Sequence, residues 1–346
     1  MINGIQQVGV GTTNVHDSWK WYRQNFGFDT PVFNEAAEAP LMIQYTGGEV
    51  HARHAILAMN LNGGGGMEIW QFTSRRSADQ HAFSLLQNGL LVTSIKCRDS
   101  KLGLESVNGN SVGGIELNPI GKKSFSVIDP FGNPFIASES DNWYQKKHSI
   151  FGGIEGIIIG VSDMEKAITF YKNVLEIDQV VYDKTQVFDD LKAFAGGLET
   201  FRRVRLTPSN RNTGAFSEVF GNFFIELLQP TSTDSISHNL KDRYWGDQGF
   251  IHLCFDVNGM DAIKSRAEAM NSPFTVDSGE TFSMGEAAGR FAYLEDPDGT
   301  LIELVETDKI TVSKKLNWFL TLSKKRKKKP LPRWLFSVMA LNRVKD

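Results

Sequence analysis

The sequence predicts an α+β protein made of four β-α-β-β-β modules. Two observations carry this prediction. Residues 7–22 and 156–171 align without a gap, and in both a strand pattern is followed by a polar cap and a helix pattern. Turns of the form Asp-Pro-x-Gly at 129–132 and 296–299 precede closing strands, because Pro and Gly favour a chain reversal. The chain is therefore expected to repeat one supersecondary unit.

The first module opens with a strand and then a helix. Asn14 can accept hydrogen bonds from the free amides of the first helical turn. Val15, Trp19, Tyr22 and Phe26 recur at helical spacing, which predicts a buried helix face. Further strands of this module are expected at 53–59 and 67–72.

The other modules follow the same order. A weaker copy starts at Val92, with a short helix from Ser100 and a closing strand at 133–137. The third copy has Ser162 and Asp163 as caps and strands at 201–206 and 223–228. The fourth runs from the strand 249–257 to a closing strand at 300–306. Four copies predict four modules.

The strand 249–257 alternates strictly between apolar and other residues. If its apolar face packs on a helix, His252 faces a cavity. Glu303 lies on the closing strand between apolar neighbours. A buried carboxylate is costly unless it is paired, hydrogen-bonded or bound to a cation. A His and a Glu on neighbouring strands therefore indicate a metal site.

Length and composition indicate a cytoplasmic globular protein. The chain of 346 residues favours two domains, at 1–147 and 148–312, with a separate tail at 313–346. It is 41% hydrophobic and 22% charged, and no apolar run approaches the ~18 residues of a membrane span. The first residues resemble no export signal. Two cysteines without metal-motif spacing fit a reducing compartment.

The repeats resemble a known family. The opening at 157–171 and the sequence Asp-Pro-Asp-Gly-Thr-Leu-Ile-Glu-Leu at 296–304 are similar to the vicinal oxygen chelate superfamily. This superfamily includes glyoxalase I, methylmalonyl-CoA epimerase, extradiol dioxygenases and bleomycin-resistance proteins. The resemblance covers about residues 3–308. It implies that modules pair into two cup-shaped mixed sheets, and that the first and last strands of paired modules hold a divalent metal.

The resemblance assigns two positions to each module: Gln7 and Glu68, Val92 and Ile136, Gly156 and Glu226, and His252 and Glu303. Two pairings of modules are open. If the first and fourth share a cup, the metal ligands are Gln7, Glu68, His252 and Glu303. If the third and fourth share a cup, the set is Glu226, His252 and Glu303. Glu226 could instead pair with Arg203 or Arg205.

The resemblance further implies one divalent metal ion, Zn, Ni, Mn, Co or Fe(II), and a small-molecule substrate with a carbonyl or hydroxyl group. Proton transfer of the isomerase or lyase type is expected, with Glu303 or Glu68 as the catalytic base. An extradiol dioxygenase is an alternative, but it needs two His ligands, and Gly156 stands where the first is expected. A non-catalytic, resistance-type binding protein is the other alternative.

The tail differs from the rest of the chain in charge. Between Lys314 and Asp346 there are eleven Lys or Arg residues and one acidic residue. Two apolar segments, with Trp318 and Phe319 and with Trp334 and Phe336, flank six consecutive basic residues at 324–329. This pattern favours a peripheral anchor on the anionic inner face of a membrane. Packing on the body is an equal alternative, and nucleic acid is not expected.

Overall fold

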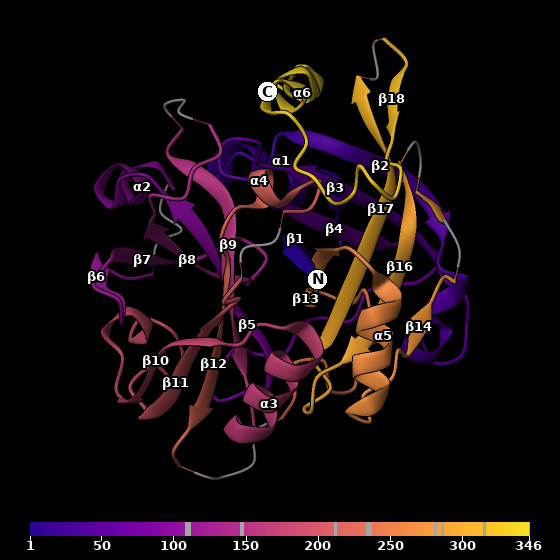
Figure 1. Ribbon diagram of the computed structural model, residues 1–346. Coiled ribbons are helices and arrows are strands. Elements are labelled where there is room, and N and C mark those ends of the chain that lie inside the picture. Colours follow the sequence, from indigo (N-terminus) through magenta and orange to yellow (C-terminus); the bar gives the residue numbers. More distant parts are fainter. Residues whose placement is uncertain are drawn as a thin grey trace.

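The computed structural model describes residues 1–107, 112–145, 149–210, 213–232, 237–279, 282–284, 287–313 and 316–345. Within these residues the long strands form two curled mixed sheets, and two modules contribute to each (Figure 1). The predicted α+β fold of four β-α-β-β-β modules in two cup-shaped sheets is confirmed.

The first and fourth modules share the larger sheet. The first contains β1 (Ile2–Gly11), α1 (Val15–Phe26), β2 (Thr30–Glu38), the 3-10 helix η1 (Pro40–Tyr45), β3 (Ala52–Met59) and β4 (Gly66–Phe72). The fourth contains β13 (Gly249–Val257), α5 (Met260–Ala269), β14 (Val276–Asp277), β15 (Phe282–Met284), β16 (Ala287–Glu295) and β17 (Leu301–Ser313). The strand order is β14-β16-β17-β13-β1-β4-β3-β2, with β15 beside β16.

The second and third modules share the other sheet. The second contains β5 (Gly89–Cys97), α2 (Ser100–Ser106), β6 (Glu116–Leu117), β7 (Lys123–Ile128) and β8 (Pro134–Glu139). The third contains β9 (Phe151–Gly160), α3 (Met164–Leu175), β10 (Gln179–Gln186), η2 (Asp189–Leu191), β11 (Phe201–Thr207), α4 (Ser217–Phe220) and β12 (Phe224–Pro230). The strand order is β10-β11-β12-β9-β5-β8-β7-β6.

The opening strands decide which modules pair. β1 runs antiparallel to β13, and β5 runs antiparallel to β9. Each sheet therefore takes one module from each half of the sequence, so the halves 1–147 and 148–312 both contribute to both sheets. Of the two pairings that the sequence left open, the structure has the first module with the fourth.

Capping residues set the starts of the repeated helices. The Asn14 side chain accepts hydrogen bonds from the amides of His16 and Asp17 at the start of α1. Asp163 accepts one from the amide of Lys166 at the start of α3. Both caps were expected from the sequence, and they satisfy amides that have no partner within the helix.

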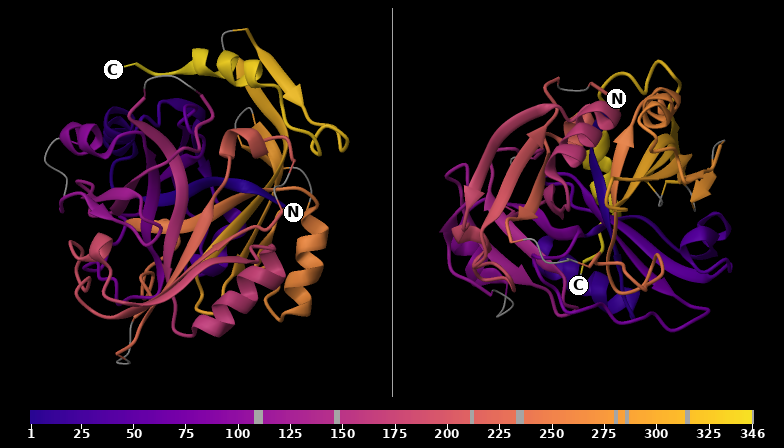
Figure 2. Two further views of the ribbon diagram at one scale, coloured as in Figure 1. Left: turned by 60° about the vertical axis from the view of Figure 1, so that its left-hand side comes forward. Right: turned by 90° about the horizontal axis from the view of Figure 1, so that it is seen from below.

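One face of each sheet belongs to a common core. Apolar residues of β1, β4, β9 and β13 pack there with α1, α3 and α5. Figure 2 shows α3 and α5 side by side, and the two helices are in contact. The residues between them in sequence point to the opposite faces, where they form separate apolar clusters in the two cups. In β4, for example, Ile69 faces the common core and Trp70 faces the cup.

The C-terminal segment lies against the body (Figures 1 and 2). Strand β18 (Trp318–Thr321) pairs with β17, and α6 (Arg333–Met339) is followed by the short helix η3 (Ala340–Asn342). Leu335 and Phe336 are buried in a cluster with α4 and β17, whereas Trp318 and Trp334 are exposed and stack with ring centroids 6.0 Å apart. Among the described residues, no helix combines the length and apolar character needed to cross a bilayer.

Candidate metal centre

The candidate centre lies on the four central strands of the larger sheet, β4-β1-β13-β17. Gln7 comes from β1, Glu68 from β4, His252 from β13 and Glu303 from β17. The register places Gly9 opposite both Glu68 and His252, and Cys254 opposite both Gln7 and Glu303. The opening and closing strands of two modules thus bring these four side chains to the middle of one cup.

Gln7 and His252 each contact both carboxylates. Nε2 of Gln7 donates to Oε2 of Glu68 at 2.9 Å and to Oε2 of Glu303 at 3.3 Å. Nε2 of His252 lies 3.2 Å from the same oxygen of Glu68 and 3.1 Å from that of Glu303. All four residues are buried. One ligand atom from each of Glu68, His252 and Glu303 can be chosen so that the three atoms lie within 4.8 Å of one another.

Two buried polar atoms at this centre have no hydrogen-bond partner in the described structure, Oε1 of Gln7 and Nε2 of His252. Nε2 is close to both carboxylates but is not aligned with either as a hydrogen bond. Oε1 of Gln7 carries lone pairs that can bind a cation, and Nε2 of His252 carries one when the imidazole ring is neutral. Leaving such atoms buried and unpaired is costly, so this donor set fits a divalent metal ion.

Gly9 makes room for the imidazole. A Cβ at this position would lie 2.5 Å from Cε1 of His252, closer than real contacts allow. The His252 ring therefore occupies space that a side chain on the neighbouring strand would fill. The sequence shows a glycine two residues after Gln7, but its role becomes clear only when β13 is known to be the neighbouring strand.

The environment of His252 combines burial with negative charge. Burial opposes the charged imidazolium, but the carboxylates of Glu303 and Glu68 raise the pKa of His252 to about 9. On the other side of the ring, the hydroxyl of Tyr293 lies 3.3 Å from Nδ1. Trp245 lies nearly parallel to the imidazole, with centroids 6.3 Å apart. These neighbours hold the ring with Nε2 toward the carboxylates.

A pocket leads to the carboxylates. Glu68 and Glu303 form part of its wall together with the aromatic rings of Trp70, Trp245 and Tyr293. Trp70 lies two residues after Glu68 on β4 and faces the same cup. The start of η1 and the Arg53 side chain line the same pocket. A small molecule could therefore reach the Glu68 and Glu303 carboxylates past a mostly apolar wall.

Glu226, from the alternative set, is not near His252 and Glu303. It lies in the smaller sheet, where Arg203 donates to its Oε2 from Nε at 2.9 Å, and Arg205 donates to its Oε1 from Nε at 2.7 Å. The hydroxyl of Tyr182 also donates to Oε1, at 2.6 Å. Burial alone would raise the pKa of Glu226, but the two guanidinium groups lower it to about 2. The alternative reading of Glu226 as a partner of Arg203 and Arg205 is confirmed.

The other positions of the second cup hold no ligand side chain. Val92 and Ile136 are apolar and buried. A Cβ on Gly156 would lie 2.3 Å from the Phe224 ring, which packs where a Gln7-like side chain would stand. The positive charge in this cup comes from arginine side chains.

Sequence reasoning missed Tyr293, Trp245 and Gln6. Tyr293 lies on β16, directly opposite Glu303. The alternation of side chains along β16 could have indicated that it faces the cup, once β16 was paired with β17. Trp245 comes from the segment before β13, for which the sequence offers no pattern. Gln6 accepts a weak hydrogen bond from Sγ of Cys254 at 3.5 Å, because a register shift in β1 between Ile5 and Gln7 turns both glutamines toward the cup.

Comparisons with known proteins agree with this architecture. Residues 153–304 match the model of the Glyoxalase/Bleomycin resistance protein/Dioxygenase superfamily. The structure is similar to glyoxalase I from Zea mays, at 13% identity and a TM-score of 0.54, over 88% of this chain and 92% of that chain. A variant of the same enzyme gives 0.56 at 14% identity, over 88% and 92%.

A candidate dioxygenase from Bacillus subtilis is similar to the same extent, with a TM-score of 0.54 at 14% identity, over 88% of this chain and 85% of that chain. At these identities the structural likeness establishes the fold alone. No curated protein sequence matches the chain significantly. The match of residues 153–304 and the four-module architecture support a relationship of this chain to the glyoxalase/bleomycin resistance protein/dioxygenase superfamily, the vicinal oxygen chelate proteins.

Proposed function

We propose that this protein is a divalent-metal-dependent enzyme that moves a proton on a small substrate bearing a carbonyl or hydroxyl group, as an isomerase or a lyase. The observation that carries the proposal is the convergence of Gln7, Glu68, His252 and Glu303 in one cup. Their carboxylates also reach a pocket. Oxygen-rich donors with one imidazole suit Zn, Ni, Mn, Co or Fe(II).

The residues fit a metal in a specific way. Glu68 and Glu303 would supply carboxylate oxygens, and His252 would supply Nε2 once that atom is unprotonated. The amide of Gln7 now presents its nitrogen to both carboxylates. A half-turn of this amide would present Oε1 in its place, and this atom has no other partner in the described structure. Tyr293 can accept a hydrogen bond from Nδ1–H and so keep the Nε2 lone pair free.

A bound divalent cation supplies Lewis-acid polarisation of the substrate oxygen, which makes an adjacent C–H more acidic. Glu68 or Glu303 would take the proton on a carboxylate oxygen and return it to a neighbouring carbon. The aromatic wall of the pocket would exclude water from this exchange. These roles need two carboxylates that are buried but reachable, and both residues meet that condition.

The extradiol dioxygenase alternative has less support. Iron sites of that type use two His and one carboxylate on one face of the metal. Of the residues the structure describes at this centre, only His252 offers an imidazole. Position 156 is a glycine in the other cup, where its neighbour is the Phe224 ring.

Metal stoichiometry tests the proposal. Protein dialysed against Mn²⁺ should retain one equivalent by elemental analysis, and His252→Ala and Glu303→Ala should retain none. Glu226→Ala, which changes the other cup, should retain a full equivalent. Full occupancy in His252→Ala would reject the centre.

Proton transfer can be measured separately from metal binding, by exchange of a substrate C–H with solvent. In D₂O, the metal-loaded protein should exchange the C–H of the hemithioacetal of methylglyoxal and glutathione, followed by NMR. Glu68→Gln and Glu303→Gln separate the two carboxylates, because the one that acts as base is needed for exchange. One bound metal without exchange on this probe or other α-hydroxycarbonyl compounds would favour a binding protein.

We also propose that the C-terminal segment contacts an anionic membrane surface. Leu316, Trp318, Trp334 and Leu341 are exposed apolar side chains of this segment. The basic turn at 324–329 is largely exposed. Lys327 is the exception, since it forms ion pairs with Glu306 and Asp308 that hold the turn on the body. Exposed aromatic rings beside exposed lysines are typical of interfacial binding.

A further inference from the structure

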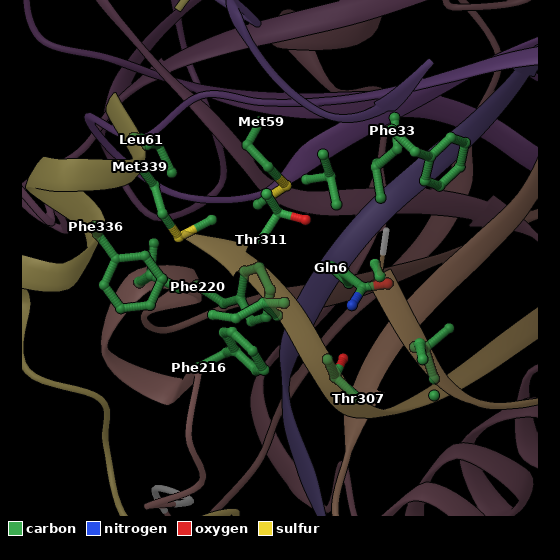
Figure 3. A pocket seen from close by; sticks show the side chains of 18 residues that line it. Gln6, Phe33, Met59, Leu61, Phe216, Phe220, Thr307, Thr311, Phe336 and Met339 are labelled. Carbon is green, nitrogen blue, oxygen red and sulfur yellow. The ribbon is translucent and has the colours of Figure 1, made fainter. Parts of the chain in front are cut away.

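An apolar pocket lies between the concave face of the larger sheet and the helices α4 and α6 (Figure 3). Strands β2, β3, β16 and β17 form one wall, and Phe216, Phe220, Phe336 and Met339 lie on the helical side. The metal-centre pocket has an entirely different set of lining residues, so this is a second compartment of the same cup.

This compartment adjoins the candidate metal centre. Leu57 in its wall is the register partner of Glu68 across β3 and β4, and cross-strand partners share a face of the sheet. Val305 lies two residues beyond Glu303 on β17, again on the same face. Gln6, also in the wall, contacts Cys254 at the centre. Residues that line the compartment are therefore direct neighbours of Glu68 and Glu303 on the same face of the sheet.

The chemistry of the lining excludes a charged ligand group there. The polar side chains in the lining are Gln6, Thr307 and Thr311, all of them neutral. Thr307 already donates to Oδ1 of Asp256. A charge moved into such surroundings would lose its hydration without a partner. Met59 and Met339, whose long thioether side chains adapt to different shapes, lie in the lining as well.

The compartment runs from the centre toward the C-terminal segment. Figure 3 shows Gln6 and Phe33 on one side and Phe336 and Met339 on the other. Helix α6 covers this second end with Phe336 and exposes Trp334 beside it. A ligand that spans the cup would thus have its polar end at Glu68 and Glu303 and its apolar end beneath α6.

From these contacts we propose that the compartment binds the aliphatic chain of an amphiphilic substrate whose oxygen-bearing head lies at the metal centre. The position of the head rests on the function proposed above. Chain binding does not, because it depends on the apolar lining alone. The substrate class is therefore a long-chain compound with a carbonyl or hydroxyl group at one end.

Chain binding is tested with dodecanoic acid and the full-length protein by titration calorimetry. Val32→Trp fills the compartment from the edge strand β2. Val181→Trp is the matched control, because Val181 is exposed on the edge strand β10 of the other sheet. Since each excluded CH₂ group weakens binding several-fold, Val32→Trp should weaken dodecanoate binding by roughly tenfold or more. Val181→Trp should leave it unchanged.

Dodecanoate that does not bind the wild type, or that binds Val32→Trp as tightly, would overturn the proposal. The wild type alone provides a second measurement that needs no variant. A dodecanoic acid with a diazirine at its chain end should label residues near α4, α6 or the end of β3 when the tryptic peptides are sequenced. Labelling confined to other peptides would contradict the assignment.

The link between chain and head is tested on Mn²⁺-loaded protein. Dodecanohydroxamic acid joins a metal-chelating head to the same chain. It should bind roughly tenfold tighter, or more, than either dodecanoic acid or acetohydroxamic acid. Equal affinity for dodecanohydroxamic and dodecanoic acid would show that chain and centre do not share a ligand. Failure of the metal centre itself would appear as loss of Mn²⁺ with dodecanoate binding retained.

Discussion

The hydroxyl of Tyr171 donates a hydrogen bond of 2.9 Å to Oδ2 of Asp296, which begins the Asp-Pro-Asp-Gly turn of the next module. The same contact occurs in the first half of the chain, where the Tyr22 hydroxyl lies 2.5 Å from Oδ2 of Asp129. Each tyrosine belongs to the helix of one module and each aspartate to the following module. These bonds therefore tie together the modules of one sequence half, whereas the sheets join modules from opposite halves.

Loss of the Tyr171 hydroxyl should destabilise the protein more at high pH than at low pH. Burial raises the pKa of Asp296 to about 6, and Tyr171 is one of the donors that limit this rise. Without it the carboxylate loses a partner, so Tyr171→Phe should cost about 1–3 kcal/mol of unfolding free energy at pH 8. The cost should be smaller at pH 5, where the carboxyl is protonated. Urea unfolding at both pH values measures this, with Tyr244→Phe at an exposed position as the control.

Asp256 should make the protein less stable as the pH rises. Burial raises the pKa of this carboxyl to about 7, despite hydrogen bonds from Asn3 and Thr307. The folded state therefore binds a proton that the unfolded state releases near pH 4. This contribution to stability is complete below pH 4 and is lost as the pH rises through 7.

Asp256→Asn removes that titration. The variant should lose less stability than the wild type between pH 5 and pH 8, by about 2–4 kcal/mol. Parallel losses in the two proteins, measured by urea unfolding, would contradict the prediction. Asp261→Asn, at an exposed position on α5, serves as the control.

Loss of the Glu226 carboxylate should lower the free energy of unfolding but should not change metal binding. Glu226→Ala leaves Arg203 and Arg205 buried without their shared carboxylate, and Asp190 still pairs with Arg203. Breaking such a buried pair costs about 3–5 kcal/mol. Asp183→Ala, on the edge strand β10 of the same sheet, breaks an exposed pair with Arg202 and should cost at most about 1 kcal/mol. Similar losses in the two variants would reject the buried network as a stabilising element.

Tyr293 should position His252 for metal binding. Tyr293→Phe removes the oxygen 3.3 Å from Nδ1 and so the group that fixes the ring tautomer. Such second partners of a ligating histidine typically contribute 10–100-fold in affinity, so Mn²⁺ should bind about 10–100-fold more weakly but still with one equivalent. Tyr182→Phe, the tyrosine beside Glu226 in the other cup, is the matched control. Unchanged Mn²⁺ affinity in Tyr293→Phe would contradict the role.

The membrane proposal needs point variants, because deletion of the C-terminal segment would expose the apolar cluster under α6. A triple change of Lys325, Lys328 and Lys329 to Glu leaves α6 in place. Each basic residue near an anionic surface contributes about 1 kcal/mol, so this variant should no longer pellet with phosphatidylserine vesicles at low salt. A control triple variant changes exposed lysines of the body: Lys20, Lys101 and Lys123. Equal pelleting of both variants, or none by the wild type, would reject the proposal.

The helix caps, the strand alternation and the turns could be predicted from the sequence alone. The polar caps Asn14 and Asp163, the alternation around His252 and the Asp-Pro turns each depend on residues close together in sequence. Such features follow from backbone preferences and side-chain periodicity over one element. They were sufficient to predict four modules and the position of each candidate ligand within its strand.

The pairing of modules depended on tertiary structure. The antiparallel contact between β1 and β13 brings Gln7 and His252 into one cup from opposite halves of the chain, while Glu226 lies in the other sheet. The pattern of each strand alone allows either edge to pair, because which edges meet depends on the apolar surface that the whole assembly buries. Tyr293 beside His252, the turn of Gln6 into the cup and the burial of Phe336 over an apolar compartment arise in the same way. Each is a contact between distant segments, and the sequence of either segment alone does not contain it.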